Sequence, residues 1–336
     1  MDKKRTNIID QIGQLFIIGF GGKEPSPAFL KFLKEENIGG VILFEENCPS
    51  HQKTKDNIME IQAQYESSTP FIAIDQEGGR VSRLRGAPAE FKSAYEYGQT
   101  GRIEQFCEEY SRSVLFMDSI GINLNLAPVC DILLNKDNKC TEGRCFGETP
   151  DIVKVFVEGA IRTAKKTRIL SCLKHFPGLG ASSIDPHLET ATADYDFETW
   201  RYREKIPFAT GINYQADMIM TTHLHLPKID DIIVTGSEKI ISEMLREHLS
   251  FDGPVITDDL TMTGAYTLGD LGPRTKAAFE AGHDILLFGA DFDKFKTAYD
   301  YFCKAVKEGQ IDENRIKLSL ERIEGLKFKL DRTMIY

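Results

Sequence analysis

Long apolar segments are absent from this 336-residue sequence. No stretch reaches the roughly 18 consecutive apolar residues that a membrane-spanning helix needs. Near the N-terminus, Asp10, Gln11 and Gln14 interrupt the positions where a signal peptide would need a continuous apolar core. We therefore expect neither a membrane span nor a cleaved leader.

Positive charge is scarce relative to negative charge. The 41 Lys and Arg residues are outnumbered by 51 Asp and Glu residues, which gives a net charge of -10. An acidic protein repels phosphate backbones and anionic lipid surfaces, so we expect no nucleic-acid partner and no membrane partner. The content of 41% apolar and 27% charged residues is typical of a soluble globular chain.

Cysteine pairs of the kind that form disulfides or bind zinc are also missing. The number of cysteines is odd, no CxxC occurs, and the positions are scattered. We therefore expect free thiols in a reducing compartment, and hence a cytoplasmic protein. The seven are Cys48, Cys107, Cys130, Cys140, Cys145, Cys172 and Cys303.

Several motifs of cofactor and metal chemistry do not occur. The first apolar run is not followed by GxGxxG, and the chain has no phosphate-binding GxxxxGK loop and no GxSxG nucleophile elbow. The histidines at 175, 187, 223 and 225 lack the helical HExxH spacing of zinc enzymes. We expect no cofactor and no metal.

Short apolar runs that alternate with helical stretches are what the sequence does contain. Eight such units predict parallel strands joined by helical crossovers, and closed on themselves they form a (β/α)8 TIM barrel. A doubly wound open sheet is the alternative, which the missing GxGxxG disfavours. The runs are 15–20, 40–44, 71–75, 122–129, 169–175, 218–223, 254–260 and 285–288. The helical stretches are 27–36, 52–65, 102–117, 152–166, 197–214, 237–249, 274–281, 292–308 and 312–330.

The chain shows no sign of division into separate domains. It has no internal repeat, no linker and no low-complexity tract. We therefore expect residues 1–336 to form a single barrel domain that ends in a helix over about 312–330. We also expect a monomer.

Single polar residues stand at the ends of five successive apolar runs. In a barrel these ends converge on the C-terminal mouth, where active sites lie. Two long connections, 132–150 and 177–196, follow the fourth and fifth runs and lie at the same mouth. The five residues are Asp75, Asp131, His175, His223 and Asp258.

The stretch Lys174–Thr190, KHFPGLGASSIDPHLET, is the loop richest in chemical groups. A buried strand enters it, and it carries Asp185 and His187 two residues apart. His187 can carry a proton near neutral pH, with Asp185 fixing its tautomer. A surface loop that happens to hold an Asp and a His is the plain alternative.

Carboxylates follow two other runs. Asp258 and Asp259 end the seventh, VITDDLTM, and because neighbouring strand residues point to opposite sides we expect only one to face the mouth. In DQEGGR, Asp75 is suited to accept hydrogen bonds from substrate hydroxyls. For Glu77 and Arg80 we prefer a structural ion pair at the rim.

Arg144 lies in the EGRCFG segment of the long fourth loop. It is placed to reach inward, although an isolated loop arginine is more often solvated. A mouth with Asp, Arg, Lys and His suits a polyhydroxylated ligand, and these residues alone predict a barrel enzyme that uses a carboxylate.

Together these stretches resemble glycoside hydrolase family 3, in particular its single-domain bacterial β-N-acetylglucosaminidases. KHFPG combined with the TDDLTM element is a specific signature of that family. The resemblance covers about residues 10–290, with the pieces in family order. They are GQLFIIGF, GGVILF, DQEGGRVSRL, NLAPVCDI, GRCFG, KHFPG, DPHLET and FDGPVITDDLTM.

The resemblance implies roles for individual residues. Asp258 matches the nucleophile of a retaining exo-β-N-acetylglucosaminidase, His187 its acid/base, and Asp185 the acid that pairs with that histidine. The residues that match those holding the terminal N-acetylglucosamine are Asp75, Arg144, Lys174 and His175. Such enzymes act in the cytoplasm on wall fragments such as N-acetylglucosaminyl-1,6-anhydro-N-acetylmuramyl peptides, which makes a small carbohydrate the expected partner.

Two positions depart from the family pattern. Leu179 replaces the histidine of KHFPGHG, and Pro186 replaces the serine between the paired Asp and His. The spacing from Lys174 to His187 is that of the family. Pro186 fixes its own φ and pushes Asp185 toward extended conformations, which predicts a stiffer loop.

Other functions stay open at this stage. A β-glucosidase or a glycoside phosphorylase of the same family is one alternative, and a catalytically inactive sugar-binding barrel is another. Hydrolysis of 4-nitrophenyl glycosides of N-acetylglucosamine and glucose, with and without phosphate, separates them.

Overall fold

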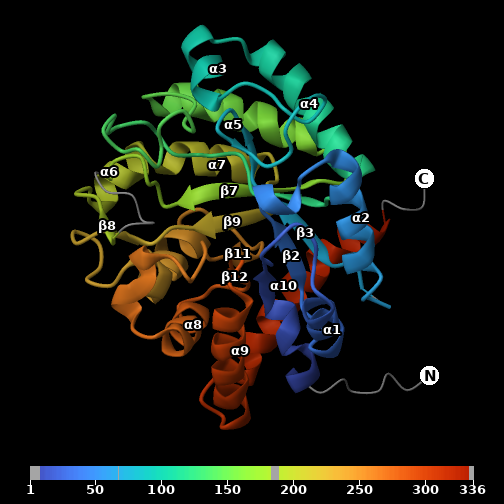
Figure 1. The fold of residues 1–336 in the computed structure, drawn as a ribbon. Coiled ribbons are helices and arrows are strands. Elements are labelled where there is room, and N and C mark those ends of the chain that lie inside the picture. Colours follow the sequence, from blue (N-terminus) through green and yellow to red (C-terminus); the bar gives the residue numbers. More distant parts are fainter. Residues whose placement is uncertain (1–7, 67, 183–188, 333–336) are drawn as a thin grey trace.

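Eight parallel strands form the centre of the structure, and helices ring them (Figure 1). The computed structural model describes residues 8–66, 68–182 and 189–332. The strands follow one another around the sheet in chain order, and a parallel bridge between Ile256 and Ile285 joins the two end strands. The predicted (β/α)8 barrel is confirmed, and the open-sheet alternative is wrong.

Each barrel strand coincides with one of the predicted apolar runs. They are β1 (Phe16–Ile18), β2 (Gly40–Leu43), β3 (Phe71–Ile74), β6 (Leu124–Asn125), β7 (Leu170–Phe176), β9 (Met218–Thr221), β11 (Val255–Ile256) and β12 (Leu286–Phe288). Two small two-stranded sheets lie outside the barrel sheet. They are the antiparallel pair β4 (Gln76–Gly78) and β5 (Val81–Ser82), and the parallel pair β8 (Ala191–Thr192) and β10 (Leu224–His225).

Each predicted helical stretch contains a helix, and the structure adds a helix over Ala94–Thr100 that was not predicted. The α-helices are α1 (Pro27–Glu35), α2 (His51–Gln62), α3 (Ala94–Thr100), α4 (Ile103–Ser119), α5 (Pro150–Ala164), α6 (Phe197–Tyr202), α7 (Lys205–Asn213), α8 (Leu271–Glu280), α9 (Phe292–Lys307) and α10 (Glu313–Arg332). The 3-10 helices are η1 (Ile8–Leu15), η2 (Glu45–Asn47), η3 (Val234–Gly236) and η5 (Thr263–Leu268), and η4 (Ile240–Glu247) is a π-helix.

The single helix expected over 197–214 is two helices, α6 and α7. Pro207 explains the break. A continuous helix would need an N–H at 207 to bond the carbonyl of Arg203, and the proline ring would collide with that carbonyl. The chain therefore leaves helical geometry at Arg203, where φ is -130° and ψ is -81°.

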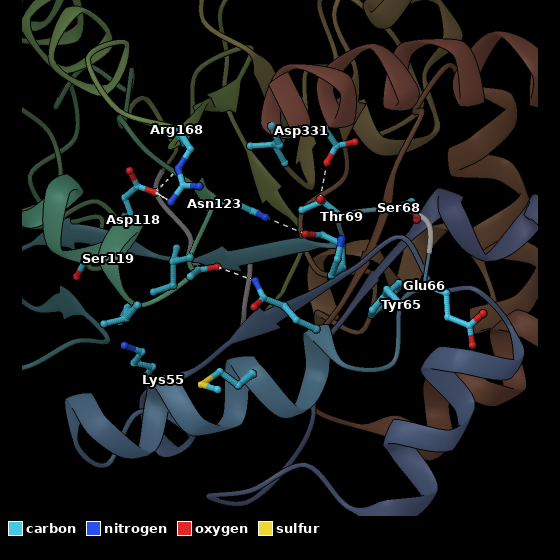
Figure 2. Close-up of a pocket in the computed structure, with 17 residues that line it drawn as sticks. Lys55, Tyr65, Glu66, Ser68, Thr69, Asp118, Ser119, Asn123, Arg168 and Asp331 are labelled. Carbon is cyan, nitrogen blue, oxygen red and sulfur yellow. Dashed lines mark hydrogen bonds and ion pairs between the residues drawn. The ribbon is translucent and has the colours of Figure 1, made fainter. Parts of the chain in front are cut away.

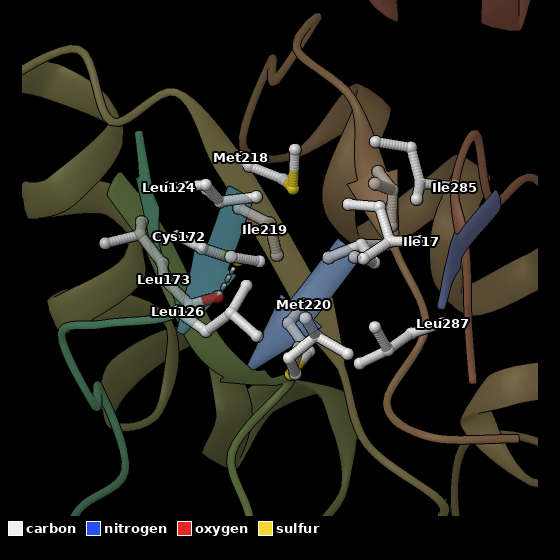
Figure 3. Close-up of a cluster of buried hydrophobic side chains, with 14 of the residues drawn as sticks. Ile17, Leu124, Leu126, Cys172, Leu173, Met218, Ile219, Met220, Ile285 and Leu287 are labelled. Atoms are coloured by element: carbon white, nitrogen blue, oxygen red, sulfur yellow. Dashed lines mark hydrogen bonds between the residues drawn. The ribbon is translucent and has the colours of Figure 1, made fainter. Parts of the chain in front are cut away.

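The apolar strand residues are buried on both faces of the sheet, as parallel barrel strands require. Figure 3 shows side chains from several barrel strands meeting in one apolar cluster. Representative members are Ile17, Leu124, Leu173, Met218 and Leu287. This packed interior holds the strand ends rigidly, so side chains placed there keep fixed positions.

The described part of the chain has neither a membrane-spanning helix nor a disulfide. No helix within residues 8–66, 68–182 and 189–332 combines the length and the apolar character needed to cross a bilayer. All seven cysteines are free thiols, and five of them are buried.

Helix α10 closes the N-terminal end of the barrel by packing against η1. Its Lys327 is 5% exposed and donates to the side chain of Gln14 at 2.6 Å and to the carbonyl of Gly39 at 2.9 Å. The ammonium also lies 5.1 Å from the ring centre of Phe71. Burial lowers the pKa of Lys327 to about 7.

A linkage between pH and stability follows for Lys327. Between about pH 10 and pH 7 the unfolded chain binds a proton that the folded chain does not, so folding weakens as the pH falls. Lys327→Met removes this term. Its free energy of unfolding, relative to wild type, should rise by roughly 1.4 kcal/mol per pH unit lowered across that window and level off below about pH 7.

Urea unfolding at several pH values measures this difference. Lys317→Met, on the exposed side of the same helix, is the matched control, and its difference from wild type should stay flat across the window. A flat difference for Lys327→Met would contradict the lowered pKa.

Candidate active site

A cavity of about 420 Å³ opens at the C-terminal ends of the barrel strands. Asp75 follows β3, His175 lies at the end of β7, Asp258 follows β11, and Gly289 follows β12. The charged and titratable residues that line it are Asp75, Glu77, Arg80, Arg83, Arg144, Lys174, His175, Asp258 and Asp259. Five of the predicted site residues therefore surround one cavity.

The β4–β5 hairpin brings Glu77 to this cavity. Gly78 and Gly79 both have positive φ, 90° and 55°, which lets the chain reverse directly after β3. A Cβ on Gly78 would lie 2.3 Å from the carbonyl oxygen of Lys92, so a side chain cannot be accommodated there. The tight turn places Asp75 and Glu77 on the same cavity.

Two carboxylates and two cations form a buried network on one side of the cavity. The Lys174 ammonium lies 2.6 Å from Asp75 Oδ1 and 2.6 Å from Glu77 Oε1. Arg144 donates from Nε and Nη2 to the two oxygens of Glu77, each at 2.8 Å. This bidentate geometry is the strongest form of such a pair.

The network keeps its members charged although they are buried. Burial alone would raise the pKa of Glu77, but Arg144 and Lys174 hold it well below its ordinary value. In the same way, Lys174 and Arg83 outweigh burial and lower the pKa of Asp75. Burial opposes the charge on Lys174, but the two carboxylates raise its pKa above the ordinary value.

His175 joins this network to the next strand. Its Nε2 lies 3.1 Å from Arg144 Nη2, and its Nδ1 lies 2.7 Å from Asp131 Oδ2. Arginine can only donate, so Nε2 accepts and the Nδ1–H donates to Asp131. The other oxygen of Asp131 accepts from the backbone N–H of Leu179 at 2.7 Å. The ring orientation is therefore fixed from both sides.

Lys174 and His175 are sequence neighbours, yet both line the cavity. Regular alternation along a strand would send them to opposite faces. The pairing of β7 with β9 shifts register between Leu173 and Phe176, so the strand is irregular at this point. The irregularity lets one short segment supply two groups to the site.

Asp258 and Asp259 occupy different environments. Oδ1 of Asp259 accepts from the N–H and the hydroxyl of Thr261, both at 2.8 Å, and burial raises the pKa of Asp259. Within the described residues, Asp258 Oδ1 accepts only from the N–H of Asp259, at 2.8 Å, and no cation pairs with Asp258. Both line the cavity, so the expectation that only one faces it is not met.

His223 supports the turn that carries these carboxylates. Its Nε2 lies 2.9 Å from the carbonyl oxygen of Asp259, and its Nδ1 lies 2.6 Å from the hydroxyl of Thr235. A carbonyl only accepts, so Nε2 donates and Nδ1 accepts from Thr235. Burial lowers the pKa of His223, consistent with an uncharged ring that positions the backbone.

The expected rim pair of Glu77 and Arg80 is wrong. Glu77 does not pair with Arg80 but with Arg144 and Lys174, and Arg80 donates to backbone carbonyls of the 132–150 loop. Arg144 reaches inward, and the solvated alternative does not hold, since its side chain is 12% exposed and lines the cavity. The positions of Arg80 and Arg144 both depend on packing between loops that are far apart in the sequence, which no local motif encodes.

Asp185 and His187 lie outside the described residues. The chain on either side of them is described. Leu179 is tied to Asp131 before the gap, and after it the Thr190 hydroxyl donates to the carbonyl of Gly264 in η5 at 3.2 Å.

A larger cavity, about 630 Å³, lies at the opposite end of the barrel (Figure 2). Three of its charged groups are engaged in structural contacts, since Arg168 pairs with Asp118 at 2.8 Å and Asp331 accepts from the hydroxyl of Thr69 at 2.5 Å. Catalytic groups of barrel enzymes lie at the C-terminal face. We therefore place the active site in the smaller cavity.

The described part of the chain contains no cluster of metal-ligating side chains. No group of three or more His, Cys, Asp or Glu side chains there is arranged to hold a metal ion. The cations of the cavity are Arg and Lys side chains.

The network predicts the effect of removing its central carboxylate. Glu77→Gln leaves Arg144 and Lys174 close together with Asp75 as their remaining negative partner. Breaking a buried pair in this way should lower the free energy of unfolding by about 3 kcal/mol. Urea denaturation at pH 7 measures it.

Glu142→Gln is the matched control, because Glu142 forms an exposed pair with Lys139 at 3.2 Å. Its loss should be much smaller. Equal losses for the two variants would mean that the buried network does not stabilise the fold.

Comparisons with known proteins point to one family. The sequence model of the glycosyl hydrolase family 3 N terminal domain matches residues 7–326. The chain is 30% identical to Beta-hexosaminidase A of Pseudoalteromonas piscicida, over 91% of this chain and 56% of that protein. It is also 30% identical to a Beta-hexosaminidase of Stenotrophomonas maltophilia strain K279a, over 81% of this chain and 82% of that protein.

A solved structure agrees as well. The glycoside hydrolase family 3 beta-N-acetylglucosaminidase of Paenibacillus sp. str. FPU-7 superposes with a TM-score of 0.92 at 30% identity, over 97% of this chain and 63% of that one. The chain thus spans 56% and 63% of the lengths of the Pseudoalteromonas and Paenibacillus proteins. The family model matches residues 7–326, which is nearly the whole chain. The chain therefore belongs to glycosyl hydrolase family 3.

Proposed function

We propose that the protein is a retaining, exo-acting β-N-acetylglucosaminidase, a β-hexosaminidase of the family. The observation that carries the proposal is the contrast among the cavity carboxylates. Asp75 and Glu77 are bound to cations, and Asp259 is bound to Thr261. Asp258 is the carboxylate without a cation or side-chain partner among the described residues, so it is available to attack.

In the proposed reaction Asp258 attacks the anomeric carbon while His187 protonates the leaving oxygen. A covalent glycosyl-enzyme forms and the glycosidic bond breaks. Water then attacks the same carbon, with His187 taking the proton, and releases Asp258. The two inversions retain the configuration. Asp185 orients the imidazole and stabilises its charged form.

The buried network supplies the sugar-binding side of the site. Asp75 offers acceptor oxygens to sugar hydroxyls, whereas Arg144 and Lys174 offer donors. His175 is held against Arg144 by Asp131. We propose that these groups hold the terminal N-acetylglucosamine, and their mutual bonds fix their positions before substrate arrives.

The proposal extends to the substrate, the cellular compartment and the oligomeric state. We propose wall-derived muropeptides as substrates, a cytoplasmic enzyme and a monomer. The similarity to two beta-hexosaminidases and to a beta-N-acetylglucosaminidase supports the hexosaminidase activity. The free thiols support a reducing compartment. The Stenotrophomonas relative, matched over 82% of its length, supports a barrel that acts without a second domain.

The nucleophile is tested by trapping. Treatment with a 2-fluoro or 5-fluoro glycosyl donor should label Asp258, since the fluorine slows breakdown of the intermediate. Asp258→Ala should nearly abolish turnover with the fold intact by circular dichroism, and Asp259→Asn should lose much less. Mass spectrometry of the labelled peptide locates the adduct, and a label on Asp259 would overturn the assignment.

The acid/base is tested by varying the leaving group. His187→Ala should slow glycosides with poor leaving groups about 10²–10⁴-fold more than activated aryl glycosides, which need little protonation. The glycosyl-enzyme should accumulate, and azide should release it as the β-glycosyl azide. The slope of kcat/KM against leaving-group pKa is the readout. Equal losses across the series would mean that another residue delivers the proton.

A further inference from the structure

The cations that line the active-site cavity differ in their partners. Lys174 contacts both Asp75 and Glu77, and Arg144 contacts Glu77. Arg83 lies 3.4 Å from Asp75. Each of these three positive charges is therefore compensated by a carboxylate of the same cavity.

Arg80 is the exception. It donates from Nε to the carbonyl of Glu142 at 2.8 Å and from Nη2 to the carbonyls of Lys139 and Cys140, each at 2.7 Å. Backbone carbonyls are uncharged, so they orient the guanidinium without neutralising it. Within the described residues no carboxylate pairs with Arg80, and its Nη1 donates no hydrogen bond.

A second guanidinium lies close to Arg80. The carbonyl of Cys140 accepts from Arg80 Nη2 at 2.7 Å and from Arg144 Nη1 at 3.1 Å. Arg144 has Glu77 as its carboxylate partner and shares it with Lys174, whereas Arg80 has none among the described residues. This edge of the cavity therefore carries unbalanced positive charge, in a protein whose net charge is -10.

The carboxylates that would repel an anion lie on the far side. Arg80 belongs to the hairpin after β3, and Asp258 follows β11. In the barrel order β11–β9–β7–β6–β3 these strands are four places apart, which in an eight-stranded barrel is the opposite side. An anion beside Arg80 is thus kept away from Asp258 and Asp259.

We propose that Arg80 is a specificity residue that binds an anionic group of the substrate, a carboxylate, sulfate or phosphate. The proposal rests on the proposed function and names its substrate class. N-acetylglucosamine itself is uncharged, so the anion belongs either to the leaving group or to a substituent on the terminal sugar. A guanidinium already fixed by three carbonyls binds an oxyanion with little loss of side-chain freedom.

Matched substrates that differ in one charge test the proposal. One pair is N-acetylglucosaminyl-N-acetylmuramic acid and its methyl ester, which differ in the charge of the leaving group. The other is 4-nitrophenyl N-acetylglucosaminide with and without a 6-O-sulfate. We expect wild type to prefer the charged member of one pair, which identifies the source of the anion.

Arg80→Gln should reduce that preference, measured as the ratio of kcat/KM values, by about 10- to 100-fold, the range for losing one charge-assisted contact. Arg80→Lys should retain part of it. Because Arg80 is exposed, added salt should also weaken the preference in wild type. Arg85→Gln is the matched control, since Arg85 lies on the same segment, is paired with Glu45, and does not line the cavity.

The outcomes are distinct. No preference in wild type, or equal losses on both members of each pair in Arg80→Gln, overturns the role of Arg80 and reduces it to a support for the 132–150 loop. Failure of wild type to hydrolyse any N-acetylglucosaminide overturns the proposed function instead. In that event dissociation constants of Asp258→Asn for the acid and its ester, with and without Arg80→Gln, still decide the anion site.

Discussion

The contact of Glu77 with both Arg144 and Lys174 is the interaction on which the active site depends. It joins the hairpin after β3, the long loop after β6, and the end of β7. Two cations cannot lie side by side in a buried position without a counter-charge, because burial penalises each charge and their repulsion adds to that penalty. One carboxylate removes both problems, and it thereby sets the relative position of three segments that are far apart in the sequence.

The same constraint divides the cavity into parts with different chemical tasks. Asp75 and Glu77 hold cations, and Asp259 is held by its own turn through Thr261. Among the described residues Asp258 has no cation and no side-chain partner, and it is partly exposed. On the other side, acceptors and donors are already paired with one another, so in the proposed function a sugar hydroxyl meets groups that are already oriented. Catalytic power in such sites comes largely from groups that do not need to rearrange during the reaction.

The sequence predicts the barrel, because eight apolar runs with period and length typical of buried strands leave few other arrangements. It also predicts which strands end in polar side chains that line the cavity, as Asp75, His175 and Asp258 show. It fails where the outcome depends on contacts between distant segments. Arg144 reaches Glu77 across 67 residues, a pairing that no local pattern encodes. The break between α6 and α7 could have been predicted from the sequence, because Pro207 would disrupt the interior of a continuous helix.

The bond from the backbone N–H of Leu179 to Asp131 has a consequence for how the family can diversify. The N–H is present whatever side chain stands at position 179, proline excepted, so the anchor does not depend on the identity of the residue. The side chain itself, 1% exposed, forms part of the cavity wall. A histidine at this position, as in the KHFPGHG pattern of the family, would leave the N–H in place and present a polar surface to the cavity instead of an apolar one. Position 179 is thus a site where natural selection can alter the lining of the pocket while the scaffold stays constant.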